Sequence, residues 1–135
     1  MATGAPDGVL MIQVAVTVEN VPVVPKAATE VAAGGIGHYA GTDQTYQTVK
    51  SWTITALKTG ELKEISFTGT VLAKTHWKVV VGALTFVTDL LIGAPLTIPF
   101  FDLKLAPATV VTVSCKSTDG SSINADASIV AKEIG

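Results

Sequence analysis

The chain has 135 residues and a formal net charge of −2, with 15% charged and 48% hydrophobic residues. This length is typical of one domain with its own core, and the composition is too apolar for a disordered chain. All nine basic residues are lysines. Because nucleic-acid binding normally needs a strongly basic face, often rich in arginine, the composition argues against nucleic acid as a partner.

β-Branched residues dominate the composition, with 18 Val, 18 Thr and 9 Ile. Such residues favour pleated strands over helices. Alternation of apolar and polar residues between turn residues predicts about eight strands, over 9–19, 50–58, 63–73, 76–81, 84–92, 96–105, 111–116 and 123–129. The turn at 117–122 predicts that the last two strands form a hairpin. The sequence thus predicts one all-β domain over 1–135, an antiparallel, jelly-roll-like sandwich.

The segment 26–48, KAATEVAAGGIGHYAGTDQTYQT, is predicted to be one long, glycine-rich loop. Its first part, 27–33, could form one or two helical turns. A connection of this length in a compact domain usually has a function or is mobile. We expect an arm that contacts a partner, the alternative being a mobile excursion without a role. The candidate contact residues are Gly34, Gly35, Gly37, His38, Tyr39, Gly41 and Tyr46.

The stretch 79–101 is long enough to span a bilayer and contains a single charge, Asp89. Glycines and prolines divide it into pieces of strand length, so two buried strands and a turn are predicted, and no membrane partner is expected. The N-terminus has Asp7 before its first apolar run and no lysine before Lys26. We therefore expect no export signal and synthesis in the cytoplasm.

No catalytic, cofactor or metal site is expected from the sequence. The chain has two histidines and one cysteine, whereas a zinc site needs three or four ligands. Cys115 alternates with valines and is predicted to be buried, as are Trp52 and Trp77. Asp89 is the only acid whose apolar setting could raise its pKa. The sequence favours a protein that is not an enzyme.

Low charge also predicts self-association. Val110, Val130 and the run at 79–81 place apolar groups on both faces of their strands. Both faces of a strand are apolar when each is covered, by another sheet, by a loop or by a neighbouring subunit. We therefore expect a homo-oligomer, either a dimer or a trimer.

The C-terminal segment 101–134, FDLKLAPATVVTVSCKSTDGSSINADASIVAKEI, has the pattern L-x-P-A-T-x-V-x-V-x-x-K-S followed by an alternating last strand. This quarter of the chain resembles the terminal hairpin of small β-sandwich virion proteins of tailed bacteriophages, the capsid decoration or cement proteins. The resemblance implies a non-enzymatic virion protein that binds a lattice of major capsid protein and reinforces it. The alternative is a β-sandwich binding module of a tail fibre or adhesin that recognises a glycan or a host surface through exposed aromatic side chains.

Overall fold

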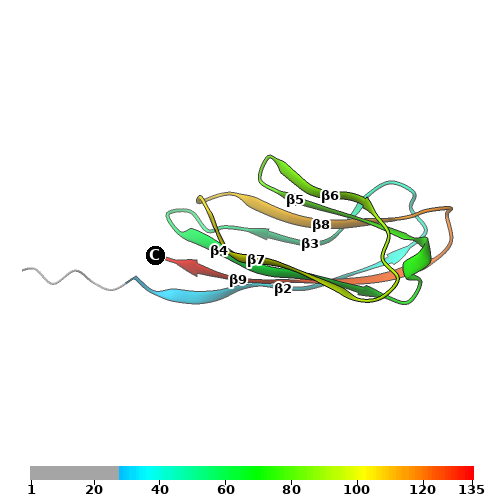
Figure 1. Cartoon of the computed structure of the whole chain (residues 1–135). Helices are drawn as coiled ribbons and strands as arrows, with labels where there is room; N and C mark the ends of the chain where they lie inside the picture. Colours follow the sequence, from blue (N-terminus) through cyan, green and yellow to red (C-terminus); the bar gives the residue numbers. More distant parts are fainter. Residues whose placement is uncertain (1–27) are drawn as a thin grey trace, which may run out of the picture.

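The computed structural model describes residues 28–135, which form eight strands and one short 3₁₀ helix (Figure 1). The elements are β2 (Glu30–Gly41), β3 (Gln47–Thr53), β4 (Thr59–Gly69), η1 (Leu72–Lys74), β5 (Thr75–Val81), β6 (Leu84–Leu90), β7 (Leu96–Leu105), β8 (Val110–Ser117) and β9 (Ile123–Ile134). The strand expected over 9–19 lies outside the described residues.

The eight strands form two four-stranded antiparallel sheets, in the orders β2-β9-β4-β7 and β3-β8-β5-β6, that stack as two layers (Figure 1). The pairing is nested: β2 pairs with β9, β3 with β8, β4 with β7 and β5 with β6. A long antiparallel ribbon that is rolled up into two sheets produces this order, which is the jelly roll. The predicted fold class, an antiparallel jelly-roll-like sandwich, is therefore confirmed.

The core lies between the two sheets and follows the alternation of the strands. Thr75, Trp77, Val79 and Val81 are the buried positions of β5, and every second residue of β9 from Ile123 to Ala131 is buried. The Trp77 ring packs against Phe67 of the opposite sheet, with 5.0 Å between ring centroids. Cys115 is fully buried, as predicted, and burial raises the pKa of its thiol to about 12.

One buried polar contact joins the two sheets. The indole Nε1 of Trp52 on β3 donates a hydrogen bond of 2.9 Å to Glu133 on β9, and the backbone N–H of Thr55 donates to the same carboxylate oxygen at 3.2 Å. Glu133 is only 9% exposed, so its carboxylate depends on these two donors in place of water.

The C-terminal hairpin predicted from 111–129 is wrong in its pairing, although both strands exist. β8 pairs with β3 and β5, whereas β9 pairs with β2 and β4 in the other sheet. The chain at 118–122 crosses from one layer to the other. The buried faces of β8 and β9 therefore lie in facing sheets and cover each other across the core. Alternation of buried and exposed residues is expected both for two strands of a hairpin and for two strands in facing sheets, so it does not distinguish them.

Several strand ends also differ from the predicted ones. β3 begins at Gln47 and β4 at Thr59, each three or four residues earlier than expected, so Gly60 lies within β4 and not in a turn. The apolar stretch 79–101 is divided among the end of β5, β6 and the start of β7, so the predicted division into strands is confirmed. The prediction that these strands are buried is wrong for β6 and β7, whose residues are all exposed or half-buried. Within residues 28–135, no helix is long and apolar enough to cross a membrane.

The long loop predicted over 26–48 is wrong for most of its length, as are the helical turns at 27–33. Residues 30–41 form β2, a twelve-residue strand paired along its whole length with β9. A Cβ atom on Gly34 would lie 2.1 Å from the carbonyl oxygen of Ile129, and one on Gly37 would lie 1.9 Å from that of Val49. Glycine stands here because β2 approaches both its partner strand and the opposite sheet too closely for a side chain.

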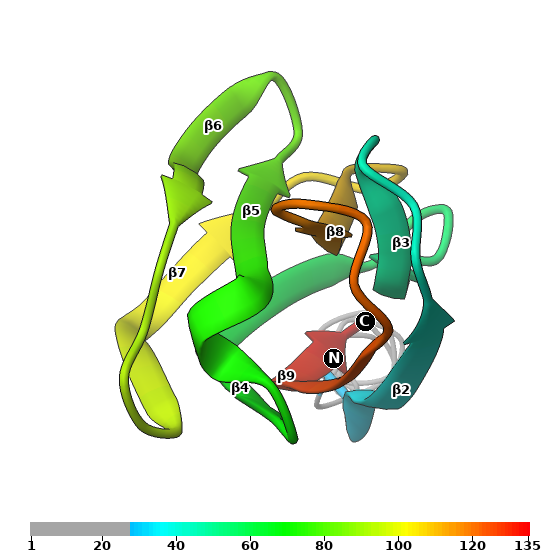
Figure 2. The same ribbon diagram turned by 90° about the vertical axis from the view of Figure 1, so that its right-hand side faces the viewer.

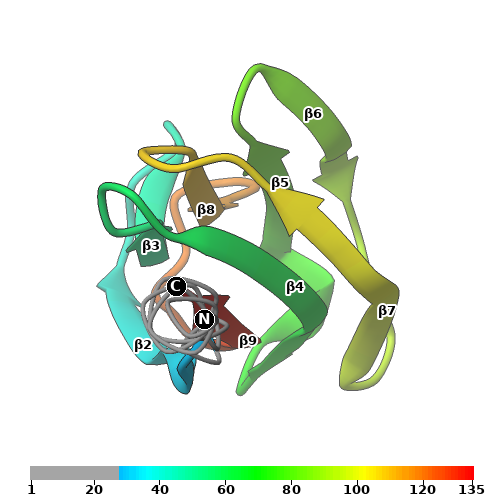
Figure 3. The same cartoon turned by 90° about the vertical axis from the view of Figure 1, so that its left-hand side faces the viewer.

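The two long sides of the sandwich differ. β2 and β3 lie together on one side, and β6 and β7 lie together on the other (Figures 2 and 3). At the β2–β3 side, Gly37 lets the two sheets meet backbone to backbone at Val49. The β6–β7 side has no such contact between its sheets among the described glycines, and its apolar side chains fill the space instead.

Candidate functional site

Most of the residues predicted to contact a partner instead make contacts within the chain. His38 on β2 has its Nδ1 2.8 Å from a carboxylate oxygen of Asp126 on the neighbouring β9. The Tyr39 hydroxyl donates a hydrogen bond of 2.7 Å to Asp43. Gly34, Gly35, Gly37 and Gly41 are positions in a paired strand. The structure thus places these residues in the sandwich and not on an arm that leaves it.

Tyr46 is the one candidate that lies between strands, and it connects β2–β3 to β6. Its hydroxyl donates a hydrogen bond to the Asp89 carboxylate, and the backbone N–H of Asp89 donates back to the hydroxyl at 2.8 Å. Lys116 Nζ lies 4.7 Å from the Tyr46 ring centroid and 3.3 Å from Asp89, and Lys78 Nζ lies 5.3 Å from the ring. These contacts make a closed network of opposite charges around one aromatic ring.

The apolar setting of Asp89 in the sequence does not raise its pKa, because the side chain is exposed on β6. Hydrogen bonds from Tyr46 and then from Lys116 hold the pKa of this carboxyl below its usual range. Desolvation instead raises the pKa of the Tyr46 phenol. Asp89 therefore remains ionised near neutral pH and is not suited to act as a general acid there.

The open side, as we name the β6–β7 side, exposes a row of large apolar side chains. Phe101 is 87% exposed, Leu84 64%, Leu91 51%, Phe86 48% and Leu96 36%. Behind them, partly buried side chains continue the row into the core, namely Val87, Leu90, Ile92, Ile98, Phe100, Leu103 and Leu105. The hydrophobic core therefore reaches the surface along this side. Several large apolar side chains exposed on one side of a protein mark an interaction site more often than isolated exposed residues do.

An aromatic pair connects the two sheets on the open side, close to Leu84 and Phe101. Phe86 on β6 and Phe100 on β7 meet edge to face, with ring centroids 5.5 Å apart and ring planes at 90°. This geometry is favourable for aromatic rings and fixes the orientation of both. Half of the Phe86 side chain nevertheless faces solvent. The pair thus offers a rigid apolar surface to a second molecule.

The backbone of β7 projects Phe101 away from the sheet. Phe101 and Asp102 have positive φ angles of 50° and 61°, a conformation that costs roughly 1–2 kcal/mol for each non-glycine residue. Here the pairing between β4 and β7 shifts register, between Leu62 and Glu64. The Asp102 side chain returns to pair with Lys63 at 2.7 Å, which also lowers the pKa of Asp102. Strain that exposes an aromatic side chain is an observation that points to a contact function.

Strand addition by another chain is not favoured along β7. Pro99 lacks a backbone N–H, and the register shift that follows it bends the strand. Both features are known devices that protect edge strands from pairing. A partner at β7 therefore has to be held by its contacts with side chains.

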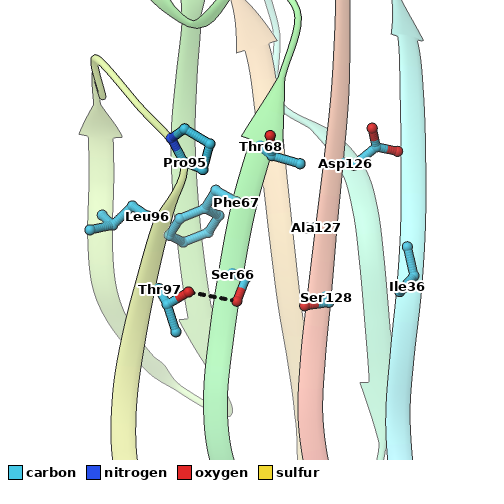
Figure 4. Close-up of a pocket in the computed structure, with 10 residues that line it drawn as sticks. All are labelled: Ile36, Ser66, Phe67, Thr68, Pro95, Leu96, Thr97, Asp126, Ala127 and Ser128. Atoms are coloured by element: carbon cyan, nitrogen blue, oxygen red, sulfur yellow. Dashed lines mark hydrogen bonds between the residues drawn. The ribbon is translucent and has the colours of Figure 1, made fainter.

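The outer face of the β2-β9-β4-β7 sheet has a shallow pocket of about 420 Å³ (Figure 4). Ile36 on β2 borders it on one side, and Pro95 and Leu96 border it on the other. Its floor is made of small polar side chains, with Ser66 and Thr97 hydrogen-bonded to each other at 2.9 Å. The acid beside it, Asp126, is paired with His38. Such a surface can accept a small apolar or hydroxyl-bearing group.

Few side chains of residues 28–135 are placed where they could act in catalysis or bind a metal ion. No group of three or more histidine, cysteine, aspartate or glutamate side chains in this part of the chain could hold a metal ion. Trp52 is 7% exposed and Trp77 is fully buried. A sugar-binding platform made of these two tryptophans is therefore excluded.

Neither a protein-family model nor a curated protein sequence matches this chain. Three similar solved structures are those of the infectious bursal disease virus VP2 subviral particle, at 14% identity and a TM-score of 0.49, of the Gt strain of that virus, at 13% and 0.48, and of its Gx strain, at 15% and 0.41. Each match covers 84% of this chain and 35–37% of the other. The chain thus spans little more than a third of the length of these chains.

Proposed function

We propose that this protein is a non-enzymatic structural component of a virion, which binds neighbouring subunits of an assembled capsid through the open side. The observation that carries the proposal is the row of exposed apolar side chains from Leu84 to Phe101 on the sandwich that residues 28–135 form. Covering such a surface releases water and is the main driving force of protein association.

Two further observations support this assignment. Double-sheet jelly rolls are frequent in viral capsid domains, although lectin domains use them as well. The sequence pattern of 101–134 resembles that of the terminal hairpin of bacteriophage decoration proteins, although here its two strands, β8 and β9, lie in different sheets. Within the virion we therefore propose decoration of a phage head, where weak contacts repeated by the symmetry of the lattice add up to stable attachment.

Density-gradient centrifugation of particles tests the proposal. The chain is expressed from its native gene, virus particles are banded from the lysate, and mass spectrometry gives the ratio of this chain to the major capsid protein. We expect the chain to band with the particles at a fixed ratio. Recovery of the chain only at the top of the gradient, free of particles, would overturn the proposed function.

A further inference from the structure

We infer that the open side binds the same side of a second copy of this chain, forming a dimer with a two-fold axis near the centre of the row of exposed apolar side chains. The inference rests on the proposed function and narrows it: the neighbouring subunit that covers the open side is a second copy of this chain, and the dimer contacts the major capsid protein through other surfaces. Such a dimer requires three things: a surface that favours an uncharged partner, enough exposed apolar area, and an arrangement in which the side chains of one copy fit those of the other.

The charges of the open side argue for a neutral partner. The segment 84–105 contains three charged residues, Asp89, Asp102 and Lys104. Each is paired within the chain: Asp89 with Tyr46 and Lys116, Asp102 with Lys63 at 2.7 Å, and Lys104 with Glu61 at 2.6 Å. A charged partner would find no unpaired charge on this segment and would lose its own hydration. A second copy presents a surface with the same neutrality.

The exposed area is large enough for a dimer. From their exposed fractions, the five side chains Leu84, Phe86, Leu91, Leu96 and Phe101 present roughly 500–600 Å² of surface, given about 150–250 Å² for a whole aromatic side chain. Two copies facing each other would bury roughly 1,000 Å² or more in total, which reaches the lower limit for specific interfaces.

The order of side chains along the row suits a two-fold axis. β6 and β7 run in opposite directions and meet at the Phe86–Phe100 pair, so Leu84 and Phe101 lie at the same end of the row as this pair, and Leu91 and Leu96 lie at the other end. A two-fold axis halfway along the row, near Val87 and Ile98, reverses the row. It places Phe101 of one copy against Leu96 of the other, where an aromatic ring meets a branched aliphatic side chain. Aromatic residues are frequent energetic hot spots of such interfaces.

The mass of the full-length chain, measured by size-exclusion chromatography with light scattering across a dilution series, tests the inference. We expect a dimer for the wild-type chain. Phe101→Ser is expected to raise the dimer dissociation constant at least a hundredfold, because a two-fold interface contains the substitution twice. Phe86→Ser should weaken the dimer as well. Ile36→Ser, which removes a 77% exposed side chain from the opposite side, is the matched control and should leave the dimer intact.

Either of two results would overturn the inference. One is a monomeric wild-type chain at all concentrations up to about 1 mM, the upper end of meaningful affinities. The other is an oligomer of any size that Phe101→Ser leaves unchanged. Phe101 is almost fully exposed, so its replacement should not unfold the chain, and circular dichroism checks this. A monomeric chain that still bands with particles would contradict the dimer but not the proposed function. A dimer that never bands with particles would contradict the proposed function but not the dimer.

Discussion

Replacement of Gly34 by alanine is expected to lower the free energy of unfolding by roughly 2–5 kcal/mol. The residue has a φ angle of +94°, and a left-handed backbone costs a non-glycine residue about 1–2 kcal/mol. The new Cβ atom would also lie 2.1 Å from the carbonyl oxygen of Ile129, on the strand to which β2 is paired. This oxygen belongs to the backbone, so it can move away from the new Cβ atom only if β9 moves. Such overpacking costs roughly a further 1–3 kcal/mol.

Urea unfolding followed by circular dichroism measures this effect, and the chain offers a matched control. Gly93 has no heavy atom within 4 Å of an added Cβ and no left-handed φ angle. Gly93→Ala should therefore change the free energy of unfolding by no more than about 0.5 kcal/mol. Equal stability of the two variants would contradict the view that glycine is required where β2 meets β9.

Replacement of Glu133 by alanine is expected to cost about 1–3 kcal/mol, because it leaves the buried indole N–H of Trp52 and the backbone N–H of Thr55 without their acceptor. Glu30→Ala is the control, since that exposed carboxylate contacts only Lys132 and should matter much less. Thermal or urea unfolding of both variants at neutral pH gives the comparison. Equal losses would show that Glu133 does not join the two sheets.

The same carboxylate gives the stability a defined pH dependence. Hydrogen bonds from Thr55 and from Trp52 hold the pKa of Glu133 below its usual value, against the opposing effect of desolvation. A lowered pKa means that the folded state binds the proton more weakly than the unfolded state does. The contribution is therefore complete above about pH 4.5 and is lost as the pH falls through the folded-state pKa. The difference in stability between the wild-type chain and Glu133→Gln should shrink between pH 6 and pH 3, and a constant difference would contradict the assignment.

The fold class could be predicted because β-strands leave a strong local signal. The alternation of Thr75, Trp77, Val79 and Val81 with His76, Lys78 and Val80 indicates which face of β5 is buried, and the structure confirms it. Glycine and proline within 79–101 correctly indicate strands in place of a membrane span. Signals of this kind depend only on neighbouring residues and do not need the tertiary structure.

β2 could not be predicted because the contacts that require its glycines come from residues distant in the sequence. Glycine weakens the local preference for a strand, so GGIGHYAG has the composition of a loop. Here Gly34 and Gly37 are required by the approach of Ile129, 95 positions later, and of Val49 in the facing sheet. Likewise, β8 and β9 show the same alternation whether they pair with each other or face each other across the core.

The open side was missed for a related reason. In the sequence, Phe86, Phe101 and their neighbours look like core residues, and alternation alone cannot tell a buried core position from a position at the edge of a sheet. β6 and β7 are the last strands of their sheets on the same side, which only the strand order reveals. A signal was nevertheless present in the sequence. The segment 84–101 contains one charge and is otherwise mostly apolar, which is more apolar than two edge strands exposed to solvent usually are.

The measurement that tests the central claim most directly is hydroxyl-radical footprinting of this protein, free and in the assembled state, with oxidation of each side chain read by mass spectrometry. We expect assembly to protect Phe86 and Phe101 on the open side, while His38 and Tyr39 on β2 keep the reactivity they have in the dilute, free chain. Protection of His38 and Tyr39 with unchanged oxidation of Phe86 and Phe101 would place the contact on the β2–β3 side and contradict the account.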